Sequence, residues 1–387
     1  MASPTRPSPT VPSPEVTLLS WRTQFCPNPS RCLAAAKLIC IGVVITVIAT
    51  SAIGTSAIAD EPRRPGNVAL ERVSGADELN RDALDRTITK AIAYLQREVT
   101  AWPQQNDCFS CHNNGDGARA LIHATTHGWP VPSDTLAATV GWLNEPDAWT
   151  RKNEALPLDD TDLALYQFTA TAQAAAVAGI PVKRASLLTA CRSLAALQTE
   201  EGSWPAAKNA LVGNPTTYGT PLATTLVTRC LQQTDARTFA APVSQARSWM
   251  RQQRPRNILN AAALLGYCAE ETDAEWKELQ EHCRELILAG QHDDGGWGPF
   301  ANVGSEPFDT AIVLLAFNLS NNRDSLGTVS ARARDYLAST QNKDGSWPET
   351  TRPANGESYA QRISTTAWCL TALLYKRENS ESLTEQP

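Results

Sequence analysis

Histidine and methionine are scarce in this chain of 387 residues, which has five His and two Met. Three familiar active-site signatures are absent: there is no G-x-S-x-G, no H-E-x-x-H and no phosphate-cradling glycine loop. No segment alternates apolar and polar residues in the way a half-buried strand does. The missing motifs exclude the enzyme classes that depend on them. The missing alternation favours an all-helical chain.

Long runs of basic residues are also missing. The net charge is −6, and the first 59 residues carry a surplus of +3, so the remaining residues carry −9. An acidic body without basic runs argues against nucleic acid as a partner.

The N-terminal region has the composition of an export signal. Residues 1–31 are rich in Pro, Ser and Thr, and Leu38 to Ala59 is an uncharged stretch of 22 residues. It ends in Ala-Ile-Ala, which suits signal peptidase, and it is long enough to cross a bilayer if it is not cleaved. We therefore expect an exported protein, either periplasmic or anchored in the inner membrane through residues 38–59. The predicted boundaries are a leader (1–59), a linker (60–84), a folded domain (85–377) and a tail (378–387).

An internal repeat organises the rest of the chain. Three segments, LQTEEGSWP, GQHDDGGWGP and TQNKDGSWPE, each place a Trp six positions after a Gln. The second and third Gln are 50 residues apart, and the first two are 93 apart, close to two such periods. Self-similarity at this period is typical of a repeat architecture. The pairs are Gln198/Trp204, Gln291/Trp297 and Gln341/Trp347.

Two kinds of helix alternate between these marks. Helices that lead into the Gln are amphipathic, as in SLLTACRSLAALQ, and helices that follow the Trp are apolar on most sides, as in FDTAIVLLAFNL. Each unit thus predicts one outer helix, a Gly-rich turn and one buried inner helix. About six such hairpins fit the chain at roughly 50 residues each. The predicted fold is an all-α (α/α) toroid, with inner helices around a central cavity.

Q-x3-G-[SG]-W resembles the QW repeat of the terpene cyclase and prenyltransferase toroids, and the inner-helix starts FDTA and STTAW resemble those of squalene-hopene cyclases. The resemblance implies an apolar isoprenoid-like ligand. It also implies a stabilising role for the motif: the Gln amide bonds free backbone groups at helix ends, and the Trp packs over it.

The same resemblance implies a general acid, which in squalene-hopene cyclases is the middle Asp of D-x-D-D-T-A. Residues 157–162 keep that position as Asp159, with Asp160 beside it, but have Pro157 in place of the first Asp. A second stretch to compare with this motif is EPFDTA. It has Phe308 at the position of the acid and keeps the next Asp of the motif as Asp309. Asp159 is therefore the best acid candidate. The alternative is that these carboxylates cap helix N-termini.

The stretch CFSCH (Cys108, Cys111, His112) has the C-x-x-C-H pattern that tethers a c-type haem. His123 and His127 follow four residues apart, so they share one helix face and are possible distal ligands. Three interpretations stay open: haem c with His112 on the iron, zinc held by Cys108, Cys111, His123 and His127 (or by His112 in place of His123), or a Cys108–Cys111 disulfide. The other five cysteines beyond the leader favour small core residues over a disulfide scaffold.

Two functions follow from the sequence. The first is an isoprenoid cyclase, an isomerase that uses an Asp general acid. The second is a non-catalytic exported toroid that binds a ligand or a protein partner and carries haem or zinc at the cysteine cluster.

Overall fold

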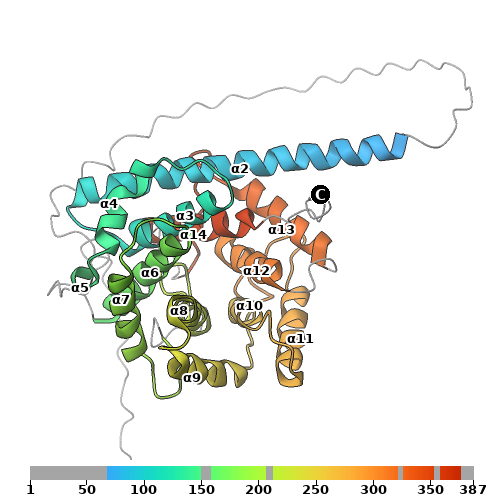
Figure 1. Ribbon diagram of the computed structural model, residues 1–387. Helices are drawn as coiled ribbons and strands as arrows, with labels where there is room; N and C mark the ends of the chain where they lie inside the picture. The colour runs from blue at the N-terminus through green and yellow to red at the C-terminus, as the bar shows by residue number, and fades with distance from the viewer. Residues whose placement is uncertain (1–67, 150–157, 206–211, 321–325, 353–357, 376–387) are drawn as a thin grey trace, which may run out of the picture. The chain divides into compact units, whose positions relative to one another are not determined.

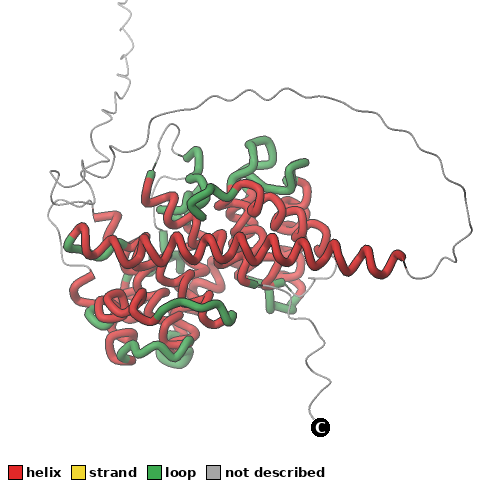
Figure 2. The backbone as a smooth tube through the Cα atoms, turned by 90° about the horizontal axis from the view of Figure 1, so that it is seen from above, coloured by secondary structure: helices red, strands yellow, loops and turns green. Residues whose placement is uncertain are grey.

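The structure of the protein is a computed structural model, and no strand occurs in the part of the chain that it describes (Figures 1 and 2). None of the described helices is both long and apolar enough to cross a bilayer. The predicted export segment and the C-terminal tail lie outside the described residues, so both stay predictions. The described residues are 68–149, 158–205, 212–320, 326–352 and 358–375, with side chains from residue 81 onward except 158–161.

The helices form two concentric rings, as the repeat predicts. In the outer ring are α2 (Val68–Asn106), α4 (Ser133–Leu143), α7 (Arg184–Ala196), α9 (Ala240–Arg251), α11 (Ala274–Ala289) and α13 (Gly327–Thr340). The inner ring consists of a π-helix η1 (Cys111–Gly117) continued by α3 (Ala118–Thr126), then α6 (Leu158–Val177), α8 (Thr220–Asp235), α10 (Ile258–Tyr267), α12 (Pro307–Leu319) and α14 (Tyr359–Leu374). A short helix, α5 (Pro146–Trp149), lies between α4 and α6.

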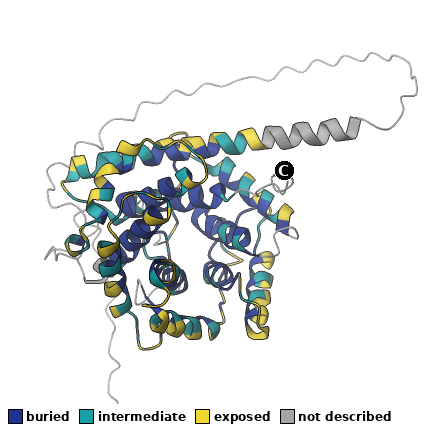
Figure 3. Cartoon of the chain, in the orientation of Figure 1, coloured by how far each residue is buried: buried dark blue, intermediate teal, exposed yellow. Residues whose placement is uncertain are grey.

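Burial separates the two rings (Figure 3). In the outer helix α7, the buried residues Leu187, Ala190, Cys191 and Leu194 form one stripe, while Arg192 is exposed. In the inner helix α12, by contrast, nearly every residue is buried. The amphipathic and all-apolar patterns of the sequence therefore predict the two layers correctly, because an outer helix has one covered face and an inner helix has two.

The ring closes on itself. Each inner helix packs against the next, and the last, α14, returns to η1 and α3. In the outer layer, α13 packs against α2 (Figure 1). Closure gives every described inner helix a neighbour on both sides, which is how a chain of hairpins of this kind buries its apolar surface.

The Gln–Trp loops clamp neighbouring outer helices, as the sequence predicts. The Gln198 amide donates to the carbonyl oxygens of Gly202, 2.9 Å away in its own loop, and Pro242, 2.8 Å away in the next outer helix. The Trp204 indole donates at 2.7 Å to the Leu194 carbonyl near the end of the preceding outer helix. Both contacts satisfy backbone groups that a helix end leaves free.

The last of these loops joins the end of the ring to its beginning. Gln341 donates to the Thr87 carbonyl of α2, 254 residues earlier in the chain, and to the Gly345 carbonyl of its own loop. Gly345 has φ +95°, and a Cβ atom there would collide with the Lys90 carbonyl oxygen. Only glycine therefore allows this close approach to α2.

The first repeat differs from the prediction in two ways. Helix α2 begins at Val68, upstream of the predicted boundary at residue 85, and it continues past Trp102 to Asn106. The inner helix begins at Cys111 with a π-helical turn, where the sequence predicts only α-helices. The reason is a cap at Ser110. Its hydroxyl accepts hydrogen bonds from two backbone N–H groups of the π-helical turn, at 3.1 and 3.3 Å, and the 3.6-residue period does not reveal such a turn.

Candidate functional site

A cavity of about 160 Å³ is enclosed by the inner ring. All six inner helices contribute to its lining, and the exposed residue Gln233 lies at its edge, where it meets solvent. The apolar part of the lining comes from Ala170, Ala174, Leu222, Leu226, Ala262, Ala263, Ile312, Leu315, Ala316, Leu319 and Trp368. A cavity of roughly 150 Å³ holds a benzene-sized group, so a longer ligand would extend toward the mouth.

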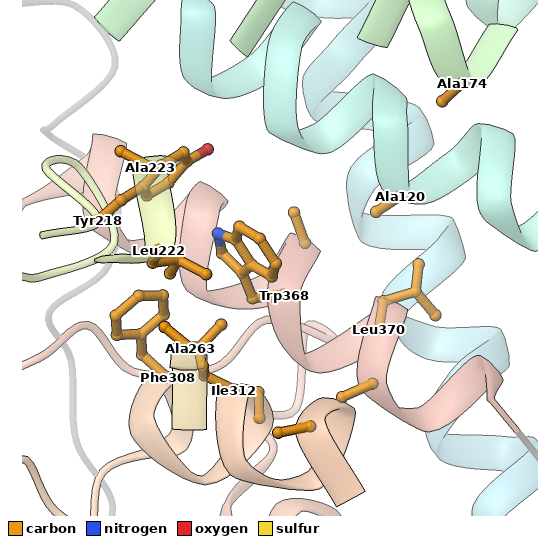
Figure 4. Packing of buried hydrophobic residues seen from close by; sticks show 14 of the residues in the cluster. Ala120, Ala174, Tyr218, Leu222, Ala223, Ala263, Phe308, Ile312, Trp368 and Leu370 are labelled. Carbon is orange, nitrogen blue, oxygen red and sulfur yellow. The ribbon is translucent and has the colours of Figure 1, made fainter. Parts of the chain in front are cut away.

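Trp368 of α14 dominates the apolar wall. Its indole lies among Leu222, Ala263 and Ile312 (Figure 4). The Tyr218 ring meets it edge-on, with 5.5 Å between ring centroids. The Arg119 guanidinium lies 5.1 Å from the centre of the indole ring. The apolar wall thus ends at a charged group.

Behind Arg119 lies a buried polar cluster centred on Asp116. Its carboxylate accepts hydrogen bonds from Arg119 Nη2 at 2.7 Å, Gln167 Nε2 at 2.9 Å, Ser364 Oγ at 2.8 Å and the Tyr218 hydroxyl. Burial raises the pKa of Asp116, and the Arg119 cation and the hydroxyl donors act against that rise. Four donors on two oxygens, one of them cationic, hold the ionised form of the carboxyl group.

Tyr218 reaches this cluster through a strained backbone. Its φ is +60°, which is unusual for a residue with a side chain, and the following residue, Gly219, has φ +78°. Burial raises the pKa of the Tyr218 phenol, so the hydroxyl keeps its proton and donates it to Asp116. The strain holds because the surrounding contacts fix the residue in place.

His112 extends the cluster by one step. Its Nδ1 lies 3.0 Å from Ser364 Oγ. Because Ser364 donates its only proton to Asp116, the hydroxyl oxygen must accept from His112, which assigns the proton to Nδ1. Burial lowers the pKa of His112 to about 4, so the imidazole is neutral at physiological pH.

A second buried ionic cluster lies at the start of α12. Arg352 donates from Nη2 to both oxygens of Asp309, at 2.9 and 3.1 Å, and from Nη1 to Glu306 at 2.8 Å. Burial raises the pKa of Asp309 to about 7, while Arg352 opposes the rise. Asp309 is fully buried but does not line the cavity.

The three predicted acid candidates belong to the first turns of two different inner helices. Asp159 and Asp160 belong to the first turn of α6, but their side chains lie outside the described residues. Their assignment stays a prediction. Asp309 is in the first turn of α12, where it forms the ion pair with Arg352.

The cysteine and histidine residues are also dispersed. Cys108 and Cys111 are half-buried and are not joined as a disulfide. His123 lines the cavity, whereas His127 is exposed and its ring packs against Tyr375 at 5.3 Å. In the described parts of the chain, no group of three or more His, Cys, Asp or Glu side chains is arranged to hold a metal ion. The zinc set is thus not assembled.

The surroundings of His112 do not fit a haem. A proton on Nδ1 leaves Nε2 with the lone pair that a metal ligand needs. However, the ring is only 3% exposed, is tied to Ser364 in α14, and does not border the central cavity. A porphyrin on this imidazole would have to separate η1 from α14. Haem c stays a prediction from the C-x-x-C-H motif alone.

Sequence reasoning missed the residues that gather around Asp116. The sequence does contain a signal, because Asp116 and Arg119 are the only Asp and Arg of residues 111–127 and their i, i+3 spacing pairs them on one helix face. The remaining partners come from positions 51 to 248 residues away in sequence, and no local pattern marks them.

Comparisons with known proteins support the fold. No family model matches the sequence, and no curated protein is significantly similar to it. Among solved structures, the chain is similar to the type II terpene cyclase MstE from Scytonema (15% identity; 76% of this chain and 97% of that chain; TM-score 0.51). It is similarly related to a variant of that enzyme in complex with its substrate, geranylgeranyl dihydroxybenzoate (16% identity; 77% and 98% coverage; TM-score 0.50). These likenesses establish a terpene-cyclase-like α/α toroid.

Proposed function

We propose that this protein binds an apolar small molecule of the isoprenoid class in the cavity of its inner ring. The observation that carries the proposal is the lining: all six inner helices face one cavity, and small residues such as Ala170, Ala174, Ala262, Ala263 and Gly266 leave it open. Empty space of this kind lowers stability, because its walls lose packing contacts. The similarity to a cyclase fold that holds a prenylated substrate supports the ligand class.

The described carboxylates favour binding over alkene protonation. Asp116 accepts four hydrogen bonds, one from a cation, and so is not a proton donor. Asp309, with a pKa of about 7 and two bonds from Arg352, is a weak acid that lies off the cavity. Cyclisation by a general acid therefore remains a finer proposal that depends on Asp159.

The binding proposal is tested with geraniol as the probe and the full chain as the protein. Geraniol should raise the Tm of the wild type, because a ligand that binds only the folded state stabilises it. Ala263→Leu fills the cavity and should abolish the rise, and Ala316→Val is a milder filling variant in case Ala263→Leu does not fold. Ala137→Leu, on the exposed face of α4, is the matched control and should keep the rise.

Two outcomes would contradict this function. Either geraniol leaves the Tm of the wild type unchanged, or it raises the Tm of the filled variants as much as that of the wild type. The same incubations, analysed for cyclised products by gas chromatography and mass spectrometry, test the finer proposal. Products that disappear in Asp159→Asn would support Asp159 as the acid, and their absence from the wild type or their persistence in the variant would count against it.

A further inference from the structure

The central cavity has a polar end that carries positive charge without a matching negative charge in its walls. Its lining includes Arg119, Arg229 and His123 but no described Asp or Glu. Arg119 is paired to Asp116 behind the wall, whereas Arg229 forms no ion pair with a described carboxylate. A cavity with this lining suits a ligand that bears negative charge.

Two buried donors at this end have no hydrogen-bond partner among the described residues. They are Nη1 of Arg119 and Nε1 of Trp368, on residues that are 7% and 6% exposed. A buried N–H group without a partner lowers the stability of a protein, and a charged one lowers it more. Such groups in a folded protein call for an explanation, and a bound acceptor supplies one.

The two donors are held in place by their surroundings. Arg119 Nη2 is fixed on Asp116 at 2.7 Å, and Asp116 is fixed in turn by Tyr218, Gln167 and Ser364. The guanidinium lies over the Trp368 indole at 5.1 Å. Because Nη2 fixes the planar guanidinium of Arg119, Nη1, which has no hydrogen-bond partner among the described residues, is a donor in a set direction.

Arg229 of α8 also lines the cavity. It donates to the Gly266 carbonyl at 2.6 Å, and burial lowers the pKa of its guanidinium. Its positive charge is costly to hold in this place. The charge of Glu270 offsets part of that cost, and an anion in the cavity would offset more. His123, one turn after Arg119 on α3, has its pKa lowered to about 4 by burial, with Arg119 adding to the effect. The positive charge at the cavity therefore comes from the two arginines.

We infer that the ligand of this cavity is an apolar monocarboxylate, whose carboxylate meets Arg119 and Trp368 and whose chain runs along the alanine and leucine wall. This inference rests on the proposed function, because it names the chemical class of the molecule bound at that same site. A carboxylate provides acceptors for both unpartnered donors and balances the charge of Arg229.

The test compares geranic acid with geraniol, which share the same carbon skeleton, by isothermal titration of the full chain at neutral pH. Geranic acid should bind about tenfold more tightly, since one hydrogen bond to a charged group is worth at least that factor. Trp368→Phe keeps the aromatic ring but removes Nε1. It should weaken geranic acid several-fold more than it weakens geraniol, because both probes lose the same part of the ring and only the acid loses the N–H donor.

Arg229→Gln keeps a donor for the Gly266 carbonyl and removes the charge, and it should lower the geranic acid affinity about tenfold. Arg119 is not substituted, because its loss would leave Asp116 buried without a cation and would test folding instead. Equal affinities for the two probes, or variants that weaken both probes alike, would overturn the carboxylate inference while the binding function stands. If neither probe binds, the binding function itself fails.

Discussion

Among the loops that join an outer helix to its inner partner in this toroid, two kinds differ sharply. Three loops carry the Gln–Trp motif, and the acidic residues between their Gln and Trp, such as Asp294 and Asp344, are exposed. The loop of the first repeat has no such motif: it begins at Cys108, forms a π-helical turn and buries His112 and Asp116. The loop between the outer and the inner helix thus stabilises the fold in three repeats, and in the first repeat it carries a polar site.

An amide nevertheless performs the same task in both kinds of loop. Gln341 bridges its own loop and the next outer helix through backbone carbonyls. In the first repeat, the Asn114 amide donates to the Val99 carbonyl of α2 at 3.2 Å and to the Thr139 hydroxyl of α4 at 2.9 Å. Adjacent outer helices are therefore clamped by a buried amide in either case, and only the chain around the amide differs.

The comparison shows what the Trp supplies. In a Gln–Trp loop the indole fills the space beneath the loop and satisfies a helix-end carbonyl, and the Trp backbone N–H donates to a Thr of the inner helix. The first loop fills the equivalent space with polar groups that must satisfy one another. Apolar packing of the first kind has no group to titrate, whereas a buried polar network can respond to pH or to a ligand.

The largest effect is expected from the motif tryptophan. Trp347→Ala should lower the free energy of unfolding by about 3–5 kcal/mol, because it empties a fully buried site and frees the Leu337 carbonyl. Urea unfolding followed by circular dichroism measures this loss. Trp347→Phe removes the N–H group and a smaller part of the ring, and Trp142→Phe is the matched control, since its Nε1 has no hydrogen-bond partner among the described residues. Equal losses in the two Phe variants would show that the indole hydrogen bond contributes nothing.

The next effect belongs to the first loop and depends on pH. The pKa of His112 is about 4 in the folded protein and near 6.5 when unfolded, so between these values the unfolded state binds more protons. The contribution of the neutral imidazole to the free energy of unfolding is complete above pH 6.5. It is lost as the pH falls from 6.5 through 4. His112→Asn keeps an N–H donor for Ser364 and should reduce the loss of stability between pH 7 and 4.5 by about 2–3 kcal/mol.

Unfolding in urea at a series of pH values gives this profile. Trp347→Phe is the comparison from the other kind of loop, and its destabilisation should be the same at both ends of the range because no titrating group is removed. A wild-type profile that His112→Asn leaves unchanged would mean that the imidazole is not buried in its neutral form.

The smallest effect tests whether the two loops share one clamp. Asn114→Ala and Gln341→Ala should each lower the free energy of unfolding by about 1–3 kcal/mol, because each leaves buried partners without a hydrogen bond. The two losses, compared under identical conditions, should agree within about 1 kcal/mol. If Asn114→Ala is as stable as the wild type while Gln341→Ala is destabilised, only the Gln–Trp loops clamp neighbouring outer helices.

Much of the fold was predictable from local patterns. The period of the repeat located the outer and inner helices, and the apolar character of segments such as residues 307–319 placed them in the inner ring. The stabilising role of Gln198 and Trp204 was also predictable, since a helix end always leaves carbonyls to satisfy. The π-helical turn at Cys111 was not, because it depends on a single serine cap.

The site was less predictable for a different reason. The C-x-x-C-H motif predicts a site at Cys108, Cys111 and His112 because these residues are close in sequence. In the structure, however, the His112 ring contacts Ser364, 252 residues away. Asp116 and Arg119 were not predicted as site residues, although Arg119 lines the cavity and Asp116 holds it in place. Charged residues of a helix interior become interpretable only when their partners on other helices are known.

What the sequence by itself determined is the architecture: hydrophobic periodicity and a repeated Gln–Trp turn specify a ring of helical hairpins, because burial and hydrogen-bond satisfaction act on each repeat locally. Only the tertiary structure decided where the ring opens into a cavity and which polar groups face it. Closure brings α3 against α14, with Tyr218 from the loop before α8, so that Asp116 is surrounded by donors. Arg119 and Trp368 line the cavity, and each has an N–H group without a hydrogen-bond partner among the described residues.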